Sequence, residues 1–433
     1  MKAVIMAGGK GTRLSSILKN LPKPMVSLAG KPLLEHQIRN LKENEITDII
    51  LVIGYLGGVI REYFEDGGRF GVTITYYVER EPLGTAGALA YLREKLEQDF
   101  ILLFGDVYID ISFKKLIAYH KEKGGVVTLY AHPNSHPYDS DLVILDKENR
   151  VIGWKRKDDE RTEDYKNLVN GGVYVCSPKI LREIPIGVSL DLEKQILMPN
   201  LEKYFISAYC CSEYVKDIGT PERLRSVEKD YLNGVCRQKN LVNKQKCVFL
   251  DRDGTINKYV GLLTDHRKME LLEHVAEALR KVNESEYLAI VVSNQPVIAR
   301  GECSYEELDK IHHRMYTLLG NAGAYVDGLY FCPHHPDRGF EGEIEELKIK
   351  CKCRKPNIGM FEQAAEDFNI DLSCSWIIGD TTTDIQAGMN AGLRTILVQT
   401  GVAGEDRKYS VQPDFIEANL LECVETILKY GKV

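Results

Sequence analysis

The chain has 433 residues, of which 44% are hydrophobic and 27% charged, and a formal net charge of −7. This length exceeds what one hydrophobic core ordinarily supports, so it predicts two domains of roughly 200 residues each. The acidic balance argues against a general nucleic-acid binder, whose binding surface would be basic. No apolar run approaches the roughly 18 residues that a membrane span needs, and the N-terminus lacks signal-peptide features.

From this composition we expect a cytoplasmic protein that acts on small molecules and has no nucleic-acid or membrane partner. A homo-oligomer is compatible with the same composition. The eleven cysteines are expected to be reduced in that compartment, so closely spaced pairs indicate metal sites before disulfides.

Short β-rich segments alternate with helical periodicity along the chain, which predicts α/β domains with mostly parallel sheets. In the N-terminal half we expect strands at 2–6, 48–53, 72–78 and 100–104, and helices at 33–41, 58–64 and 85–96. After a polar segment the pattern restarts, with strands at 247–250, 288–293, 328–331, 375–379 and 395–398. The predicted domains are 1–235 and 247–433, with a linker at 236–246.

A glycine-rich turn follows the first predicted strand and includes Ala7, Gly8, Gly9, Gly11, Thr12 and Arg13. Its glycines let successive backbone N–H groups approach phosphate oxygens, and Arg13 adds positive charge. The spacing matches neither the dinucleotide-binding fingerprint nor a Walker loop. A purely structural turn remains an equal alternative on this motif alone.

Further motifs in the N-terminal half favour phosphate chemistry. Lys23 lies between two prolines, which is a stiff mount for a cation. Gly84 and Thr85 precede a predicted helix, where a base or sugar could pack against the backbone. Asp106 and Asp217 each follow an apolar segment, and two carboxylates could hold one Mg²⁺ between phosphates.

In this order the motifs resemble the sugar-1-phosphate nucleotidyltransferase family over about residues 1–232, which implies a Rossmann-like domain with a mixed sheet. The resemblance implies that a sugar 1-phosphate attacks a nucleoside triphosphate and releases pyrophosphate. It places Arg13 and the glycine turn on the triphosphate, Lys23 on the α-phosphate, and Asp106 and Asp217 on Mg²⁺. The residues that it implies for the sugar phosphate pocket are Glu79, Asn170, Gly171, Gly172, Glu193 and Lys194.

In the C-terminal half, Asp251 and Asp253 follow a buried apolar run, and Gly254 comes next. One carboxylate can attack phosphorus while the other protonates the leaving oxygen. We expect Ser293, Asn294 and Gln295 to hold the phosphate and Lys355 to neutralise the transition state. Mg²⁺ held by Asp251, Asp380 and the carbonyl of Asp253 would let an anionic nucleophile approach an anionic phosphate. Asp384 lies one helical turn beyond Asp380, and its role, metal ligand or structural, stays open.

This order of motifs resembles the haloacid dehalogenase phosphatases over about residues 246–430. A Cys/His cluster narrows the resemblance, because Cys332, His334, Cys351 and Cys353 form two close pairs. Four soft ligands without an open position predict a tetrahedral structural zinc, with a chance cluster on a loop as the alternative. The metal would staple the insert between the pairs and fix Arg354 and Lys355 toward the active site. We expect the neighbouring His335 to be solvated rather than a ligand.

The zinc loop and the segment 293–301 resemble the D,D-heptose 1,7-bisphosphate 7-phosphatases and the related histidinol-phosphate phosphatases. Pro296 departs from that pattern, since the family usually has a small serine there. Removing the 7-phosphate of a heptose bisphosphate leaves a heptose 1-phosphate, which suits the other domain. The two resemblances therefore imply a bifunctional enzyme of nucleotide-activated heptose synthesis, with GTP as the expected nucleotide.

Two alternatives remain open. One is a nucleotidyltransferase for another sugar, of the mannose or glucose type, fused to a histidinol-phosphate-type phosphatase. The other is a sensor or scaffold that binds a nucleotide sugar without turnover. Overall, the sequence predicts two three-layer α/β/α domains, a nucleotidyltransferase and a haloacid dehalogenase-like phosphatase with a zinc loop.

Overall fold

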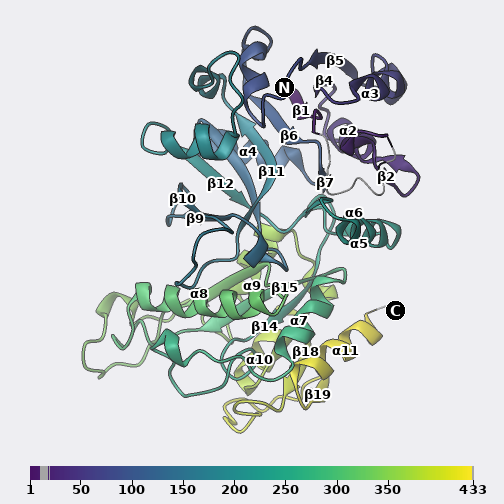
Figure 1. Ribbon diagram of the computed structural model, residues 1–433. Coiled ribbons are helices and arrows are strands. Elements are labelled where there is room, and N and C mark those ends of the chain that lie inside the picture. The colour runs from purple at the N-terminus through teal and green to yellow at the C-terminus, as the bar shows by residue number, and fades with distance from the viewer. Residues whose placement is uncertain (10–17, 19, 432–433) are drawn as a thin grey trace. The chain divides into compact units, whose positions relative to one another are not determined.

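The computed structural model describes residues 1–9, 18 and 20–431. It divides into two compact units, each with its own sheet (Figure 1). Unit 1 comprises residues 1–132, 141–156 and 168–240, and unit 2 comprises 133–140, 157–167 and 241–433. The change of unit after residue 240 falls inside the predicted linker, whose bounds stay a prediction. The sequence pattern did not indicate that two loops of the N-terminal half, 133–140 and 157–167, group with unit 2.

Unit 1 is built on a nine-stranded mixed sheet within the described residues. Strands β1, β4, β5 and β6 pair in parallel, whereas β11 runs antiparallel to β6 and β8. The nine strands are β1 (Lys2–Met6), β4 (Asp48–Ile53), β5 (Thr73–Val78), β6 (Phe100–Phe104), β8 (Val127–His132), β9 (Leu142–Leu145), β10 (Val151–Lys155), β11 (Val169–Cys176) and β12 (Ile206–Cys210). The predicted mixed sheet is confirmed.

Two short antiparallel pairs complete the strands of unit 1: β2 (Ser27–Leu28) with β3 (Lys31–Pro32), and β7 (Val107–Asp110) with β13 (Tyr214–Asp217). The α-helices are α2 (Leu33–Glu43), α3 (Gly57–Phe64), α4 (Phe113–Lys123), α5 (Pro221–Leu232) and α6 (Val235–Gln238). Where a helix was predicted at 85–96, the structure has the 3-10 helix η4 (Gly87–Lys95). A short π-helical segment, η7 (Leu192–Leu197), carries two of the predicted sugar-site residues.

Unit 2 contains a parallel sheet in the order β16-β15-β14-β17-β18-β19, six strands within the described part of the chain. The strands are β14 (Lys246–Leu250), β15 (Tyr287–Asn294), β16 (Gly328–Cys332), β17 (Trp376–Gly379), β18 (Arg394–Val398) and β19 (Phe415–Glu417). The helices are α7 (Val275–Asn283), α8 (Tyr305–Asn321), α9 (Gly359–Phe368), α10 (Thr382–Ala391) and α11 (Leu420–Tyr430). In this unit the backbone N–H of Tyr165 donates to Thr317 Oγ1 of α8 at 2.9 Å.

The side chains of β14 show why unit 2 has three layers. Successive residues of a strand point to opposite faces of its sheet. Val248 and Leu250 pack into one core with residues of α7, α8 and α11, whereas Cys247 and Phe249 pack into another with residues of α9 and α10. Both faces of the sheet are therefore covered by helices, as predicted, and the carboxyl ends of the parallel strands meet at one edge.

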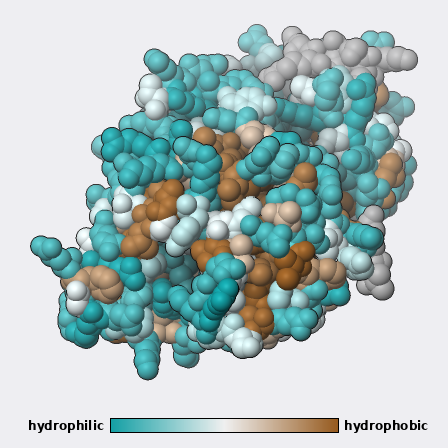
Figure 2. All heavy atoms as spheres, turned by 90° about the horizontal axis from the view of Figure 1, so that it is seen from below, coloured by the Kyte–Doolittle hydropathy of each residue, from teal (hydrophilic) through white to brown (hydrophobic). Residues whose placement is uncertain are grey.

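The face of the molecule viewed in Figure 2 is largely hydrophilic, with hydrophobic residues in separate patches. Exposed large apolar side chains include Tyr259, Val260 and Leu262, which lie on one loop. Isolated apolar side chains are common on protein surfaces. Among the described helices, none is both long enough and apolar enough to cross a membrane.

Candidate active sites

The glycine-rich turn begins directly after β1. Ala7 is buried, and its N–H donates to the carbonyl of Val52 at 2.7 Å, which ties the turn to the neighbouring strand β4. A Cβ on Gly8 would fall 2.3 Å from Oε2 of Glu79. Only glycine therefore leaves Glu79 its place beside the turn. Gly9 follows, whereas the predicted phosphate-binding residues Gly11, Thr12 and Arg13 lie outside the described residues.

Lys23, Asp106 and Asp217 come together in unit 1. The ammonium of Lys23 contacts Asp106 Oδ2 at 2.7 Å, and the N–H of Ile218 donates to the carbonyl of Asp106 at 3.1 Å. Burial opposes ionisation of Asp217, but Arg223 at 2.6 Å, the N–H of Gly219 and the nearby Lys23 hold its pKa below the usual range. Two carboxylates beside one lysine suit a divalent cation between phosphates.

A buried glutamine supports this cluster, and the sequence analysis did not find it. Gln37 on α2 donates from Nε2 to the carbonyls of Phe104 at 2.9 Å and Val107 at 2.7 Å. These two carbonyls flank the Gly105–Asp106 turn. Gly105 is required there because a Cβ would approach the carbonyl oxygen of Met6 to 2.7 Å. A helix with a polar residue on its buried face was the available signal.

Contacts among the described residues bring only part of the predicted sugar pocket together. Asn170 on β11 donates to Glu193 Oε1 at 2.6 Å, and Tyr174, which the sequence analysis missed, donates to the same oxygen at 2.9 Å. Burial raises the pKa of Glu193 and also that of Glu79. Lys194 is exposed, next to Glu193. A half-buried carboxylate with two donors can orient a sugar hydroxyl.

Gly84 and Thr85 hold the segment that carries Glu193. Gly84 has a φ of +73°, and a Cβ there would lie 2.4 Å from the carbonyl oxygen of Leu190. The hydroxyl of Thr85 accepts from the N–H of Leu192 at 2.8 Å. The structure thus gives these two residues a scaffolding contact; their predicted nucleotide contact stays a prediction. Gly171 and Gly172 follow Asn170 in β11 and were predicted to line the same pocket.

In unit 2, the predicted nucleophile Asp251 stands at the end of β14 beside Lys355. The ammonium of Lys355 lies 2.7 Å from Asp251 Oδ1, 2.6 Å from Asp384 Oδ1 and 2.7 Å from the carbonyl of Val292. Lys355 is only 3% exposed. Its carboxylate partners raise its pKa, against the effect of burial. Asp384, whose role the sequence left open, also accepts from the N–H and hydroxyl of Thr381 in a capping box that starts α10.

Carboxylate oxygens of Asp251, Asp380 and Asp384 all lie within 4.8 Å of one another. Burial, with the neighbouring carboxylates, raises the pKa of Asp251 to about 7 and that of Asp380 to about 8. Oδ1 of Asp380 is buried, and no group among the described residues forms a hydrogen bond with it. One lysine, which contacts Asp251 and Asp384, accompanies three buried carboxylates, so the donor set is short of positive charge and fits a hard divalent cation.

Asp253, the predicted acid, is turned toward a buried arginine. Arg252 is fully buried and contacts the Asp253 carboxylate at 2.7 Å. Burial opposes ionisation, but Arg252 and the amides of Asn257 at 3.0 Å and Gln295 at 2.9 Å hold the pKa of Asp253 below its usual range. Arg252 and Asn257 lie within the motif that the sequence analysis chose, but they were not assigned roles.

Three polar residues at the end of β15, Ser293, Asn294 and Gln295, link Asp253 to Lys355. Gln295 Nε2 also donates to Ser293 Oγ at 2.7 Å. Asn294 accepts from the N–H of Lys355 at 3.0 Å and donates to its carbonyl at 3.1 Å. Ser293 and Gln295 are buried beside the aspartates. Side chains at the end of β15 therefore contact both Lys355 and Asp253.

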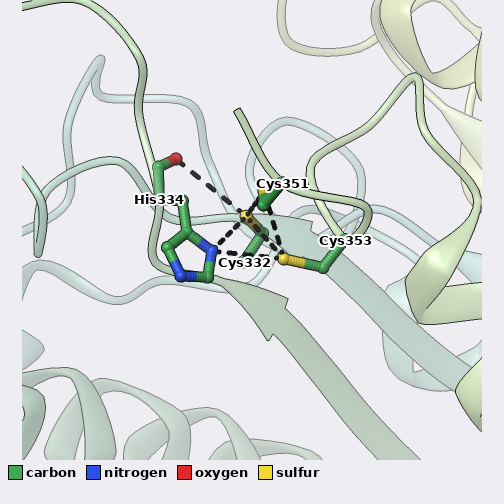
Figure 3. Close-up of side chains that lie close together, drawn as sticks. All are labelled: Cys332, His334, Cys351 and Cys353. Carbon is green, nitrogen blue, oxygen red and sulfur yellow. Dashed lines mark hydrogen bonds between the residues drawn. The ribbon is translucent and has the colours of Figure 1, made fainter. Parts of the chain in front are cut away.

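The predicted zinc ligands converge as Figure 3 shows. The Sγ atoms lie 3.5 Å apart for Cys332 and Cys351, 3.1 Å for Cys332 and Cys353, and 3.3 Å for Cys351 and Cys353. His334 presents Nδ1 at 3.3 Å from Cys353 Sγ. Ligands about 2.3 Å from a tetrahedral zinc stand about 3.8 Å apart, so this cluster is close to the required size. Its thiol and imidazole donors fit zinc.

The positions predicted for the neighbours of the Cys/His cluster are confirmed for Lys355 and wrong for His335. Arg354 Nη1 donates to the carbonyl of His334 at 3.2 Å, so this side chain rests on the zinc loop, while Lys355 reaches the aspartates. The expectation that His335 is solvated is wrong, because its side chain is buried. Its N–H donates to the carbonyl of Leu347, which folds the insert back over it.

Comparison with known proteins gives matches in both units. The pattern of the family described as nucleotidyl transferase matches residues 2–234, and that of the family described as HAD-hydrolase-like matches residues 352–423. The D-glycero-beta-D-manno-heptose-1,7-bisphosphate 7-phosphatase of Haemophilus ducreyi is 40% identical over 161 residues, which is 37% of this chain and 86% of that protein.

The N-terminal half has a different set of relatives. The mannose-1-phosphate guanyltransferase of Schizosaccharomyces pombe is 33% identical over 254 residues, 57% of this chain. The chain covers 66% of that protein, less than two thirds of its length. The solved structure of HddC from Yersinia pseudotuberculosis is 27% identical, with a TM-score of 0.47, and covers 53% of this chain and 99% of that one.

Proposed function

Because the chain belongs to the nucleotidyl transferase family and, through unit 2, to the family of the heptose-bisphosphate 7-phosphatase of Haemophilus ducreyi, we propose that it is a bifunctional enzyme. In this proposal unit 2 removes the 7-phosphate of D-glycero-D-manno-heptose 1,7-bisphosphate. Unit 1 then transfers a nucleotidyl group, GMP from GTP, to the resulting heptose 1-phosphate and releases pyrophosphate. The product of one site is the substrate of the other.

The observation that carries the phosphatase proposal is the buried contact between Lys355 and Asp251. A lysine at 2.7 Å from the strand-end carboxylate favours its anionic form, against the effect of burial, which raises the pKa of Asp251 to about 7. Because the same ammonium also contacts Asp384, it stays in position when Asp251 moves toward a phosphorus atom. Lys355 can then stabilise the negative charge as it shifts from the carboxylate of the nucleophile to the phosphoryl oxygens.

The proposed phosphatase reaction has two steps. An oxygen of Asp251 attacks phosphorus, the bond from phosphorus to the sugar oxygen breaks, and Asp253 donates a proton to that oxygen. Asp253 then takes a proton from water, whose oxygen attacks the aspartyl phosphate and releases orthophosphate. The contacts that keep the pKa of free Asp253 low suit the second step. For the first step, a bound phosphate ester must supply the negative charge that favours its protonated form.

The proposed transfer in unit 1 is a single displacement. A phosphate oxygen of the sugar 1-phosphate attacks the α-phosphorus, and the bond to the β-phosphate oxygen breaks, so pyrophosphate leaves. Lys23 would stabilise the charge on the α-phosphate, and Arg13 with the glycine turn would hold the triphosphate. Glu79, Asn170, Glu193 and Lys194 would orient the sugar phosphate. Such catalysis depends on positioning and charge neutralisation more than on proton transfer.

Both reactions call for a divalent cation, and the carboxylate sets fit one. Asp106 and Asp217 would hold magnesium in unit 1, and Asp251, Asp380 and the carbonyl of Asp253 would hold it in unit 2. When bound, the cation neutralises phosphate charge so that an anion can approach phosphorus. In the zinc loop, Cys332, His334, Cys351 and Cys353 would hold a structural zinc that closes the insert.

A second candidate sugar is mannose 1-phosphate, because the relatives of the N-terminal half include mannose-1-phosphate guanyltransferases. The same names support a guanylyl group as the one transferred. The described pocket residues do not select between the two sugars. Mannose and the heptose differ in the length of the carbon chain attached to the ring. The heptose is preferred because it connects the two units through one intermediate.

The deciding experiment supplies α- and β-heptose 1,7-bisphosphate with each of the four nucleoside triphosphates and Mg²⁺, and follows products by mass spectrometry. We expect GDP-heptose and orthophosphate. Orthophosphate without a nucleotide sugar would limit the proposal to the phosphatase. A parallel reaction with mannose 1-phosphate separates the second candidate, since it needs only unit 1.

Two variants assign each activity to its unit. Asp251→Asn should abolish orthophosphate release and leave pyrophosphate release from supplied heptose 1-phosphate unchanged. Asp106→Ala should have the opposite effect, with at least about a 10²-fold loss of transfer. Loss of both activities in either variant would refute separate sites.

A further inference from the structure

Gln295 lies directly after β15, and both N–H groups of its side-chain amide already have acceptors. Its Nε2 donates to Asp253 Oδ2 at 2.9 Å and to Ser293 Oγ at 2.7 Å. A primary amide has two N–H donors, so Gln295 must give up one of these contacts before it can donate to a bound phosphate. The sequence predicted Gln295 as a phosphate ligand. In the structure its amide contacts the predicted acid and a neighbouring hydroxyl instead.

The charges on either side of this amide determine its orientation. Arg252 Nη2 donates to Gln295 Oε1 at 3.1 Å. Turning the amide over would place Oε1 against the Asp253 carboxylate and Nε2 against the guanidinium, and both contacts would then be repulsive. Arg252 Nη2 also donates to the two oxygens of Asp253, at 2.9 and 2.7 Å. Arg252, Asp253 and Gln295 therefore form a closed ring of hydrogen bonds, in which each side chain fixes the orientation of the other two.

The members of this ring differ in how far they are buried. Arg252 is fully buried and Gln295 is 2% exposed, whereas the side chain of Asp253 keeps 21% of its exposure. Side chains in a close-packed interior stay in one arrangement. Arg252 and Gln295 therefore hold Asp253 from the interior, and its carboxylate is the member of the ring that a substrate can reach.

The backbone of Gln295 is fixed as firmly as its side chain. Its N–H donates to the carbonyl of Cys332 at 2.8 Å, at the end of the neighbouring strand β16. The next residue is Pro296, whose ring restricts the residue before it to extended conformations. Pro296 is also the position at which this chain departs from the phosphatases that it resembles, which usually have a serine. In this chain the departure stiffens the segment that carries Gln295.

We propose that Gln295, anchored by Arg252, is a positioning residue of the phosphatase, which holds the carboxyl of Asp253 in the orientation for proton transfer to the leaving sugar oxygen. The inference rests on the proposed function of unit 2 and adds how its acid is oriented. In the first step an oxygen of Asp251 bonds to phosphorus, the bond from phosphorus to the sugar oxygen breaks, and that oxygen takes the proton of Asp253. Such a transfer depends on the alignment of the acid with the breaking bond.

The test compares two phosphate esters whose leaving groups differ in their need for a proton, with the full-length protein loaded with Mg²⁺ and zinc. Heptose 1,7-bisphosphate loses a sugar alkoxide, which must be protonated as the bond breaks. p-Nitrophenyl phosphate loses nitrophenolate, which is stable as an anion. Single-turnover measurements at saturating substrate, by rapid quench for the sugar and by stopped-flow absorbance for nitrophenolate, report the first step alone. Changes in KM and in the hydrolysis of the aspartyl phosphate therefore do not affect the comparison.

Two variants remove the amide donors. Gln295→Met keeps a side chain of similar length, and Gln295→Glu keeps the shape and the acceptor for Arg252 but cannot donate to Asp253. Each should lower the first-step rate with heptose 1,7-bisphosphate about 10- to 100-fold. The rate with the aryl ester should fall by less than about threefold, because its leaving group gains little from an acid. Gln363→Met is the matched control, since it removes an exposed amide that donates to Asp367 at 2.9 Å, and it should match the wild type with both esters.

A loss of equal size with the two esters would overturn the proposal, because it would give Gln295 a structural or phosphate-binding role. Unchanged rates with both esters would overturn it as well. If Gln295→Met lacks the unfolding transition reported by Trp376, the comparison is decided by the isosteric Gln295→Glu. Neither result affects the phosphatase proposal, which is refuted instead by a wild type that releases no leaving group from either ester.

Discussion

Replacing Lys355 with methionine tests the charge balance on which the phosphatase proposal depends. The variant keeps a side chain of similar length but removes an ammonium that contacts Asp251, Asp384 and the carbonyl of Val292. Removing one partner of a buried ion pair costs about 3–5 kcal/mol, because the remaining charge is buried without compensation. We expect the free energy of unfolding of unit 2 to fall by an amount of this order near pH 8.

The same loss should shrink as the pH falls. The pKa of Asp251 in the folded wild type is already raised to about 7 by burial, and Lys355 acts to lower it. Without Lys355 the pKa rises further. An acid whose pKa is raised by folding stabilises the protein below the unfolded pKa of about 4 and loses that contribution as the pH rises through the folded value. The difference in free energy of unfolding between the wild type and the variant is therefore smallest near pH 5 and largest above pH 8.

Urea unfolding in magnesium-free buffer measures this effect. The two tryptophans report on different units, Trp154 in unit 1 and Trp376 in unit 2. Only the transition reported by Trp376 should move. Lys281→Met, which removes an exposed partner of Glu425, is the matched control and should leave both transitions in place. The catalytic constant of the phosphatase should drop about 10²- to 10³-fold, while pyrophosphate release is unaffected. A deficit that is equal at pH 5 and pH 8.5 would show that the ion pair is not its source.

Three further predictions concern the metals and the other unit. Mg²⁺ should raise the melting temperature of unit 2 more at pH 8 than at pH 5, because Asp251 and Asp380, with pKa values raised to about 7 and 8, must ionise to bind it. At a Mg²⁺ concentration about 100 times the dissociation constant, the free energy of unfolding should rise by about 2.7 kcal/mol. A stabilisation that does not depend on pH would contradict the carboxylate site. Cys351→Ser should lower the zinc content, loosen the insert and raise the phosphatase KM about tenfold without changing the transferase activity. A zinc-free variant with an unchanged KM would exclude a structural metal. Gly8→Ala should displace Glu79 and raise the KM for the sugar phosphate, measured by pyrophosphate release, with the phosphatase of the same preparation as its internal control.

Several contacts at the two sites could be anticipated from the chain because a strand places its last residue at a known edge of the sheet. Asp251 and Gln295 follow parallel neighbouring strands, β14 and β15, so their proximity follows from topology. The Cys/His cluster was predictable for a similar reason, since two closely spaced pairs of residues need only one loop to close. Which nitrogen of His334 faces the thiols, Nδ1, required the folded geometry.

Other contacts depended on distances that local sequence does not encode. Lys355 and Asp251 are 104 residues apart, and nothing in either motif indicates that Asp384 shares the same ammonium. Gln37 contacts carbonyls on both sides of a turn nearly 70 residues away, and its role follows from how α2 packs. The burial of His335 depends on the path of the insert, whose composition alone suggested a solvated loop.

The sequence by itself determined the two α/β domains and their families, and it picked out most of the side chains that we propose to be chemically active. Periodicity and motif order are local properties, and parallel strands bring their ends together in any such sheet. Only the tertiary structure decided which charges are paired: Asp253 with Arg252, Lys348 with Glu343, and Lys355 with both Asp251 and Asp384. Pairing depends on distances of a few ångströms between segments brought together by packing, and such distances are set by the whole core rather than by any one segment.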